Sequence, residues 1–533
     1  LSQQLDPGQE IVRSYDFEAV ASNGNQINDS TSMFNAFDGK PNTYWAVTKT
    51  PSWISLKLKA EYVIQKYSIV CGNDLNAAPS SWQFLASNDG TIWVTLDTQT
   101  DIKFAAKNLK MLFKVKNSHK FRYYKIHVDQ TFQPNSTMEL SQIQFIECGP
   151  VLPWLLGPFE KAKSANPVLR TRQDDLWMCP VSKKMVKWEG YALYNPGVIV
   201  KDGKINVLYR AQDEALTSRV GLATTSDGHK FDRNPEPIFF PKEDDMYKYE
   251  WPGGTEDPRI VQGPDGYVLT YTTYDGTVAR LAVATSKDLK EWTKHGIAFK
   301  DAQDGKYIDL WSKSGAIVTE IVGNKILAKK IDGKYWMYWG DTNIFLATSV
   351  DMIKWSPVED KDGNLEIALK PRENFFDSRL VESGPPALFT EKGIVLIYNG
   401  MNNQFGDKFL ADGTYAAGQA LFDSNNPGKL IDRSDQYFLY PDQEFEIYGQ
   451  VNQVCFVEGL AYYKNKLFLY YGTADSLLAV AETDYGVNQL SGWAIFGIII
   501  GVLVMICAIV LIVWLIRNKR KTYQAIVNDH ITD

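Results

Sequence analysis

Histidine is scarce in this chain, and the catalytic motifs that depend on it are absent. Only five of the 533 residues are histidine, and there is neither a His-Glu-x-x-His motif nor a cluster of cysteine and histidine, which excludes the usual zinc hydrolase sites. No Gly-x-Ser-x-Gly element is present, so the nucleophile of a serine hydrolase is not expected. The net charge of −7, without a basic patch in the large N-terminal part, argues against a nucleic-acid partner.

Cysteine is also rare, and it says little about the fold. Cys71 and Cys148 lie in the first 150 residues, and Cys179 and Cys455 lie in the next 335. Either pair could form a disulfide in an oxidising compartment, and the sequence does not decide between bridged and free thiols. Asn28 and Asn135 each begin an Asn-x-Ser/Thr acceptor for glycosylation.

One long apolar run is present near the C-terminus. Residues 492–516 contain no charged side chain, and 25 residues suffice for a helix across roughly 30 Å of hydrocarbon. Trp493 and Trp514 stand near the two ends, where aromatic rings favour the membrane interface, and a basic cluster follows. We expect a single-pass type I membrane protein with an extracellular or luminal N-terminal part and a cytoplasmic tail, 517–533. The start at Leu1 fits a chain whose signal peptide has been removed.

Residues 10–150 show short strand-like segments separated by glycine and asparagine turns. No helical period of useful length occurs here, which favours a β-sandwich. Four tryptophans mark the segment and are expected in its core: Trp45, Trp53, Trp82 and Trp93.

This segment resembles the discoidin, or coagulation factor V/VIII type C, family. The resemblance is carried by Phe37-Asp-Gly39 with Thr43 and Trp45, by Ser87-Asn-Asp-Gly90 with Trp93, and by Phe121-Arg-Tyr-Tyr124. It implies a jelly-roll sandwich that often binds carbohydrate through loops at one end. Some members hold calcium beside the residues that match Asp38 and Thr43. Here Gln142 stands where an acidic ligand is common, which argues against calcium; no other cofactor or metal is expected.

Residues 155–485 contain an internal repeat. Five strand-like segments each carry a tyrosine followed by a small or polar residue, at spacings of 62, 67, 60 and 72 residues: Tyr209, Tyr271, Tyr338, Tyr398 and Tyr470. Five β-rich repeats of this length predict a five-bladed β-propeller. The predicted fold class is therefore all-β, with a sandwich, a propeller and one transmembrane helix.

A polar cluster precedes most of the tyrosine strands. If each cluster opens the innermost strand of a blade, its side chains converge in one central funnel: Asn195, Glu256, Asp257, Arg259, Lys313, Glu382 and Glu458. The alternative is that these are turn residues at solvated blade edges. Paired carboxylates in an aromatic-rich funnel are typical of glycoside cleavage, and the cations could orient sugar hydroxyls or bind phosphate.

The same residues resemble glycoside hydrolase family 130. The resemblance rests on Gly253-Gly-Thr-Glu-Asp-Pro-Arg-Ile260, Asn195-Pro196, Tyr209-Arg210, Gly384-Pro-Pro386 and Tyr470-Tyr-Gly-Thr-Ala-Asp475. It implies action on β-mannosides by inverting phosphorolysis or hydrolysis. It assigns Asp257 as general acid, with the proton passing through a sugar hydroxyl, and it places Asn195, Arg210, Glu256 and Arg259 around the sugar.

Some positions depart from the phosphorylase pattern of that family. Asn399 replaces a phosphate-binding histidine, Asp341 stands where an arginine is expected, and Ser314 replaces an aspartate after Lys313. Loss of cations leaves a phosphate dianion poorly compensated. We therefore predict hydrolysis, with Glu382 as the general base, and Asp341 and Glu458 in reserve.

Three functions remain open from the sequence. The first is a membrane-anchored β-mannoside hydrolase, the second a phosphorylase or mannosyl-transferring enzyme, and the third a glycan-binding receptor without activity. The expected partners are a β-mannoside oligo- or polysaccharide and a membrane. The residues expected to bind substrate beside the catalytic pair Asp257 and Glu382 are Asn195, Arg210, Glu256, Arg259, Lys313, Asp341, Asn399 and Glu458.

Overall fold

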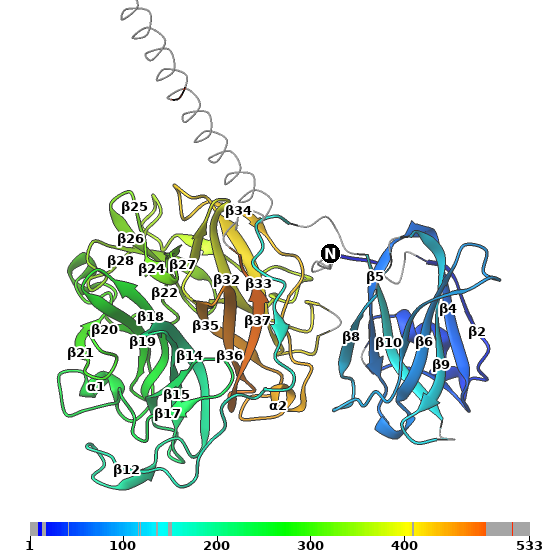
Figure 1. Ribbon diagram of the computed structural model, residues 1–533, viewed down its shortest axis with the longest axis horizontal. Coiled ribbons are helices and arrows are strands. Elements are labelled where there is room, and N and C mark those ends of the chain that lie inside the picture. Colours follow the sequence, from blue (N-terminus) through cyan, green and yellow to red (C-terminus); the bar gives the residue numbers. More distant parts are fainter. Residues whose placement is uncertain are drawn as a thin grey trace, which may run out of the picture. The chain divides into compact units, whose positions relative to one another are not determined.

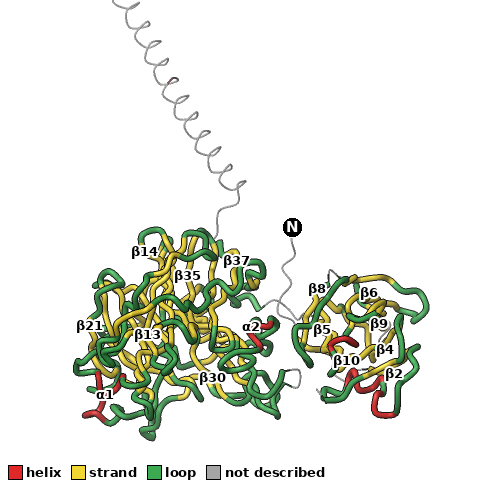
Figure 2. Tube along the Cα trace, turned by 90° about the horizontal axis from the view of Figure 1, so that it is seen from below, coloured by secondary structure: helices red, strands yellow, loops and turns green. Residues whose placement is uncertain are grey.

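The computed structural model describes residues 9–12, 17–40, 42–115, 117, 119–134, 137–147, 152–407, 410–486 and 514. The predicted transmembrane span 492–516 and the tail 517–533 lie outside these residues, apart from Trp514. Within the described ranges, no helix is both long enough and apolar enough to cross a membrane. Strands dominate the described structure, and its two α-helices, α1 (Tyr247–Glu250) and α2 (Glu444–Ile447), are four residues long (Figure 2).

The N-terminal domain is a sandwich of two five-stranded antiparallel sheets (Figure 1). One sheet has β1 (Gln9–Val12), β10 (Met138–Glu147), β5 (Ile64–Cys71) and β8 (Lys110–Lys114) in that order, with β3 (Trp45–Val47) also paired to β10. The other has β2 (Phe17–Ser22), β4 (Ser52–Tyr62), β9 (Phe121–Thr131), β6 (Pro79–Ser87) and β7 (Val94–Gln99).

The tryptophans of this domain divide between its core and its surface. Trp45 and Trp82 are fully buried, as expected from the sequence. Trp53 and Trp93 are only half-buried, and their ring centroids lie 4.7 and 3.6 Å from the Lys125 ammonium. Successive strand residues face opposite sides of a sheet, so Trp53, next to the buried Ile54, points outward. Two of the four predicted core residues are therefore surface residues.

Gln142 takes the central position in the loop where related domains can hold calcium. Its Nε2 donates hydrogen bonds to the backbone oxygens of Asn35 and Lys40, at 2.9 and 3.0 Å, and to Asp38 Oδ1 at 2.9 Å. Oxygens of this kind are the ligands that calcium prefers. In this structure the Gln142 amide nitrogen bonds all three oxygens, and the absence of calcium from this domain stays a prediction.

Replacing Gln142 by glutamate should make the sandwich depend on calcium. Without the ion, a carboxylate would face three oxygen acceptors, and we expect a loss of about 1–3 kcal/mol in unfolding free energy. Added calcium should restore it. Thermal unfolding of the full chain in chelator and in calcium measures both effects.

Gln144→Glu, a buried residue of the same strand, is the matched control and should be destabilised without responding to calcium. Identical unfolding of Gln142→Glu in chelator and in calcium would contradict this account of the loop.

Residues 160–484 form five consecutive antiparallel meanders, one for each sequence repeat. The first contains β14 (Ala192–Lys201), β15 (Lys204–Gln212), β16 (Ser218–Thr225) and β17 (Asp232–Arg233), and the second β18 (Gly254–Gly263), β19 (Gly266–Tyr274), β20 (Ala279–Ser286) and β21 (Thr293–Ile297). The third contains β22 (Ala316–Ile317), β26 (Lys334–Trp339), β27 (Ile344–Ser349) and β28 (Ser356–Pro357). The fourth contains β30 (Leu380–Ser383), β31 (Leu388–Thr390), β32 (Gly393–Met401), β33 (Tyr415–Phe422) and β34 (Leu430–Arg433), and the fifth β35 (Cys455–Tyr463), β36 (Lys466–Thr473) and β37 (Leu477–Asp484). Short strands occupy the connections: β12 (Leu176–Met178), β13 (Met185–Lys187), β23 (Thr319–Val322), β24 (Lys325–Ala328), β25 (Lys330–Ile331) and β29 (Ile367–Leu369).

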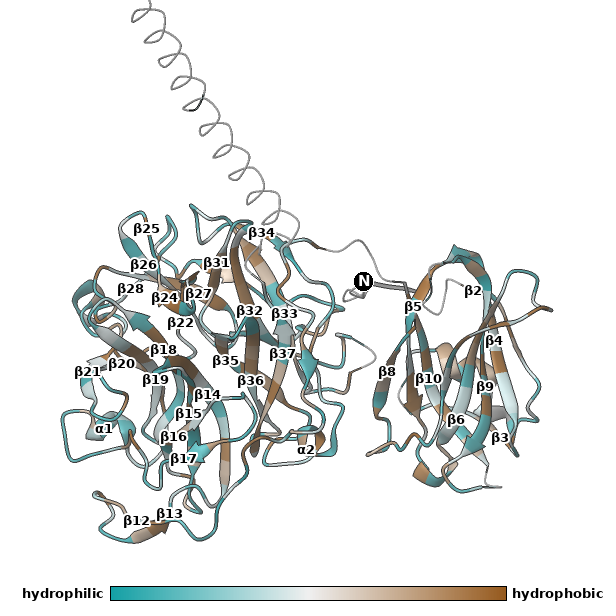
Figure 3. Cartoon of the chain, viewed as in Figure 1, coloured by the Kyte–Doolittle hydropathy of each residue, from teal (hydrophilic) through white to brown (hydrophobic). Residues whose placement is uncertain are grey.

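The tyrosine that defines each repeat is a core residue. All five side chains are fully buried, so each hydroxyl needs a partner inside the protein. The partners are Glu189 for Tyr209, Glu250 for Tyr271, the Pro427 carbonyl for Tyr338, Asp377 for Tyr398 and the Gly228 carbonyl for Tyr470. Strands are mainly apolar and loops mainly polar in Figure 3, as the burial of these strands requires.

Glycines allow the innermost strands to approach closely. A Cβ on Gly197 would lie 2.3 Å from the Pro258 oxygen, and one on Gly459 would lie 2.7 Å from the Pro196 oxygen. Both distances are too short for any side chain, so only glycine permits this packing. The first inner strand, β14, therefore lies between those of the second and fifth meanders.

The remaining neighbours complete a ring. Gln262 pairs with Leu327 and Thr319 pairs with Leu388, which joins the second, third and fourth meanders. The Asn399 side chain bonds the Val457 backbone and joins the fourth to the fifth. This ring fits the predicted five-bladed propeller.

The fifth meander is completed by the first strand of the domain. In β11 (Glu160–Lys161), Lys161 pairs with Ala481 of β37. The Lys161 ammonium also bonds Asp442 and the buried Glu446, both at 2.7 Å. The two ends of the domain therefore lie in the same sheet.

Candidate active site

Bulges of the inner strands carry several of the predicted funnel residues. The strand register shifts at Asn195 in β14, after Glu256 in β18 and at Glu458 in β35. Asn195 and Asp257 have φ angles of 46° and 44°, in the left-handed region that asparagine and aspartate tolerate best. A bulge re-aims its side chain out of the regular alternation. Asn195 Nδ2 donates to Asp257 Oδ1 at 2.8 Å, so the two bulges point toward each other.

Arg210, from β15, holds the two neighbouring carboxylates of the second meander. Its Nη2 donates to Glu256 Oε1 at 2.7 Å and its Nη1 to Asp257 Oδ1 at 2.9 Å. The Ser218 hydroxyl bonds both Arg210 Nε and Glu256, and the Arg210 guanidinium lies 4.8 Å from the centroid of the Tyr194 ring. Arg210 and Glu256 keep 13% and 10% of their side-chain surface exposed, which leaves them open to a ligand.

Lys313 lies between the two proposed catalytic carboxylates. Its Nζ is 4.0 Å from Asp257 Oδ2 and 3.8 Å from Glu382 Oε1. These two oxygens are therefore at most about 8 Å apart, compatible with the roughly 6.5–9.5 Å between the carboxyl groups of inverting glycosidases. The Ser314 hydroxyl donates to the same oxygen of Glu382.

The two carboxylates differ in how tightly they hold a proton. Burial disfavours the ionised form of Asp257, but Arg210, Lys313 and the bond from Asn195 outweigh it and lower the pKa to about 2. Burial raises the pKa of Glu382, and Lys313 and Ser314 offset this only in part. In the free site Asp257 is thus ionised at neutral pH, whereas Glu382 holds a proton more readily than an exposed glutamate.

Three predicted sugar-binding residues are enclosed by protein. Arg259 is 2% exposed, and Asn399 and Glu458 are fully buried. Both polar ends of the Asn399 amide bond the Val457 backbone, at 2.9 and 2.8 Å. The structure thus gives Asn399 a role in joining two meanders.

Asp341 positions an aromatic ring that the sequence did not single out. Its Oδ2 accepts a hydrogen bond of 2.8 Å from Trp311 Nε1, and Trp311 is 48% exposed. Trp311 is two residues from Lys313, so it belongs to the rim of the same site. No sequence pattern marks Trp311, because one tryptophan in a loop does not differ from many others.

Asp475 is a further carboxyl group in this region. It is the last residue of the Tyr470-Tyr-Gly-Thr-Ala-Asp475 motif, but it was not among the predicted site residues. Burial, together with the charges of Asp257 and Glu382, raises its pKa to about 6, against the opposing effect of Arg210. Burial is the largest cause of this shift, so Asp475 holds a proton more readily than an exposed aspartate.

Asp475→Asn should stabilise the protein at high pH only. A pKa above the ordinary 3.8 means that the folded chain holds the proton more tightly than the unfolded chain. The stability linked to this proton is complete below about pH 4 and is lost as the pH rises through about 6. The urea midpoint of the variant should equal that of the wild type at low pH and exceed it at pH 8.

Asp227→Asn supplies a control of opposite sign. Backbone N–H groups of Lys230 and His229 lower the pKa of Asp227 to about 2, so its removal should cost stability at neutral pH. A midpoint difference for Asp475→Asn that does not change with pH would contradict the raised pKa.

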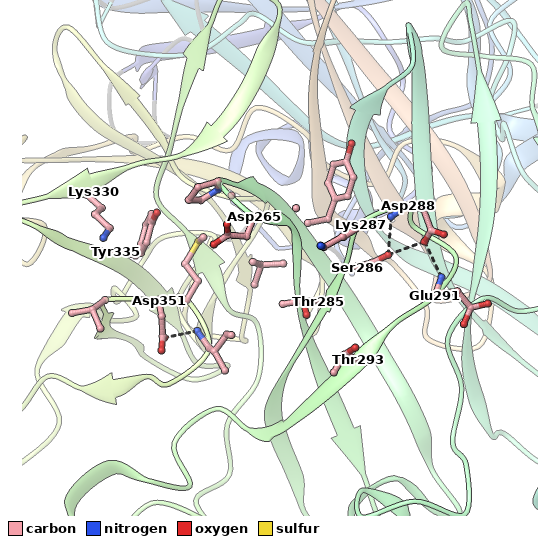
Figure 4. A pocket seen from close by; sticks show the side chains of 18 residues that line it. Asp265, Thr285, Ser286, Lys287, Asp288, Glu291, Thr293, Lys330, Tyr335 and Asp351 are labelled. Atoms are coloured by element: carbon pink, nitrogen blue, oxygen red, sulfur yellow. Dashed lines mark hydrogen bonds between the residues drawn. The ribbon is translucent and has the colours of Figure 1, made fainter.

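A cavity lies apart from these residues. It has a volume of about 690 Å³ and is lined by turns of the second and third meanders, around Asp265, Lys287, Tyr335 and Asp351 (Figure 4). None of the predicted site residues lines it. The Asp351 carboxylate in its wall accepts backbone N–H groups of its own turn, an ordinary structural role.

Comparisons with known proteins assign both domains of the chain to families. Buried carboxylates beside arginine and lysine are typical of enzymes that act on carbohydrates. Residues 160–489 match the model of glycoside hydrolase family 130, described as β-1,4-mannooligosaccharide phosphorylase, and residues 18–140 match the F5/8 type C, or discoidin, domain. The chain therefore belongs to glycoside hydrolase family 130, with a discoidin domain before the family domain.

Relatives of both reaction types are found. A 1,2-β-oligomannan phosphorylase from Thermoanaerobacter sp. (strain X514) is 28% identical over 309 residues, 55% of this chain and 90% of that protein. A glycosyl hydrolase structure from Bacteroides ovatus is 48% identical, with a TM-score of 0.62, and the match covers 63% of this chain and 96% of that one. Another structure with the same identity, TM-score and coverage comes from work on family members that are glycoside hydrolases targeting β-1,2-mannosidic linkages in Candida mannan.

Proposed function

We propose that this protein hydrolyses β-mannosides with inversion, using Asp257 as general acid and Glu382 as general base. The observation that carries the proposal is that Lys313 lies within 4.0 Å of both carboxylates, 3.8 Å from Glu382 and 4.0 Å from Asp257. A base in that place can activate water on one face of the sugar while the acid serves the other.

The charge of the site favours water over phosphate. Among the described residues, three cations gather with six carboxyl groups: Arg210, Arg259 and Lys313 with Glu256, Asp257, Asp341, Glu382, Glu458 and Asp475. Each cation already lies beside a carboxylate. A phosphate dianion would need cations that these carboxyl groups already engage, which is costly in a desolvated site.

Phosphorolysis is the second candidate, and the phosphorylase relatives favour it. They share 28% identity or less with this chain, whereas the hydrolase structures share 48%. The relatives also suggest the linkage, since both a phosphorylase and a hydrolase structure are described with β-1,2-mannosides. We propose β-1,2-mannosides as the substrate class. The membrane anchor and the extracellular or luminal location stay predictions.

The proposed reaction uses one water and moves two protons. Glu382 takes a proton from water, and the water oxygen attacks C1 of the mannoside as the C1–O bond breaks. The leaving oxygen receives a proton from Asp257, directly or through a sugar hydroxyl, and the products are α-mannose and the shortened glycan. Because Asp257 is ionised in the free site, bound sugar must raise its pKa by excluding water.

The wild-type chain should release mannose from β-1,2-mannobiose without phosphate. Glu382→Gln cannot take a proton and should lose at least about 10³-fold in kcat. Azide added to Glu382→Ala should restore turnover and yield α-mannosyl azide, because azide needs no base. Chromatography and NMR of the products measure all three.

Glu320→Gln is the control, since Glu320, in β23, pairs with Lys329 outside the site. Mannose 1-phosphate formed only with phosphate would establish phosphorolysis instead. Normal turnover by Glu382→Gln would remove Glu382 from the mechanism.

The two pH profiles should differ in their alkaline limbs. The profile of kcat/KM reports the free enzyme and that of kcat the complex. If sugar raises the pKa of Asp257, kcat should fall at a higher pH than kcat/KM. A 4-nitrophenyl β-mannoside, whose leaving group needs little protonation, should lack this limb. Equal limbs for both substrates would show that Asp257 is not the acid.

A further inference from the structure

We propose that Arg259 and Glu458 form a buried strut that sets the separation of Asp257 and Glu382, and that neither contacts the sugar. This inference rests on the proposed pairing of those two carboxylates. It changes the role expected for both residues from the sequence, where they were placed around the substrate.

Arg259 connects the two backbone segments that carry the catalytic groups. It follows Asp257 by two residues in β18. Its Nε donates to the Gly384 oxygen at 2.8 Å and its Nη2 to the Ser383 oxygen at 2.7 Å. Those two carbonyls directly follow Glu382. One rigid guanidinium therefore ties the segment of the acid to the segment of the base.

Gly384 makes this attachment possible. A Cβ there would lie 2.6 Å from the Ile397 oxygen and 3.2 Å from the Val457 oxygen. Only glycine lets this segment pack so closely between the fourth and fifth meanders. The carbonyls that receive Arg259 are thus held on a backbone with little freedom to shift.

Glu458 is the carboxyl group beside this buried guanidinium; burial raises its pKa, and the charge of Arg259 opposes that only in part. Its Oε2 lies 3.5 Å from Arg259 Nη2, and its side chain is fully buried. Neither Glu458 oxygen, nor Arg259 Nη1, has a hydrogen-bond partner among the described residues. Unpaired buried charge is costly, so each group depends on the other. Glu458 is fixed through its neighbour Val457, whose backbone is held by Asn399.

The strut matters because the separation of acid and base determines the reaction. A displacement of about 1 Å at the reacting groups can cost about 10²-fold in rate. Lysine at position 259 would keep the charge but could not bond both carbonyls, because it lacks the planar fork of the guanidinium.

The test compares Arg259→Lys, Glu458→Gln and the double variant in the full chain. We expect kcat on β-1,2-mannobiose to fall about 10²-fold for Arg259→Lys and about tenfold for Glu458→Gln. The Kd for the same sugar, measured by calorimetry, should stay within about threefold of wild type. The double variant should be no slower than Arg259→Lys, because both changes act through one strut.

Arg219→Lys is the matched control. Arg219 is equally buried, with Nη1 bonded to Asp213 at 2.8 Å and to the Thr217 oxygen at 3.1 Å, and lies outside the site. It should lose a comparable amount of Tm while keeping kcat.

Other outcomes overturn the proposal. Binding weakened tenfold or more in Arg259→Lys would show a sugar contact. Unchanged kcat in both single variants, or losses that multiply in the double variant, would show that no shared strut exists. A wild type without turnover would reject the proposed function, and the Kd comparison would still decide whether Arg259 contacts the sugar.

Discussion

Charge compensation is the constraint on which this site depends. Glu256, Asp257 and Glu382 converge from different parts of the ring, and carboxylates so close and so buried repel one another. Arg210 and Lys313 lie between them and make the arrangement possible. The same two cations affect the reaction. They keep Asp257 ionised before substrate binds, and they already pair with carboxylates, so they are not free to bind phosphate.

The scaffold meets this constraint with a repeated device. Each repeat buries a tyrosine whose hydroxyl has a fixed partner, which makes every meander a rigid unit. Bulges at the start of the inner strands then turn polar side chains away from the sheet. The core residues repeat almost without change, whereas the bulge residues differ from one meander to the next. Different catalytic and binding side chains can therefore occupy equivalent positions in repeats that share one architecture.

Much of the fold and of the site could be predicted from the sequence, because the spacing of its repeated residues indicates both. Tyrosines about sixty residues apart predicted the five repeats, and the polar residues before them converge as expected at Asn195, Asp257 and Glu382. The burial of each polar side chain could not be predicted. A polar residue at the start of an inner strand can face either the open funnel or the backbone of the neighbouring strand. Arg259 and Asn399 are of the second kind, and only their partners reveal it. Trp311 lacked any repeating pattern.

Strand β11 has a consequence for how the domain is made. The strand that completes the fifth meander is the first to be synthesised, and its partner β37 is among the last. During translation the ring stays open until residue 484 has emerged. Until Glu446 has been synthesised, Lys161 lacks this partner. Because the site draws on several meanders, it has no partial form on the ribosome. A chain released early would carry every proposed catalytic residue and still lack the enclosure that gives Asp257 and Glu382 their different affinities for a proton.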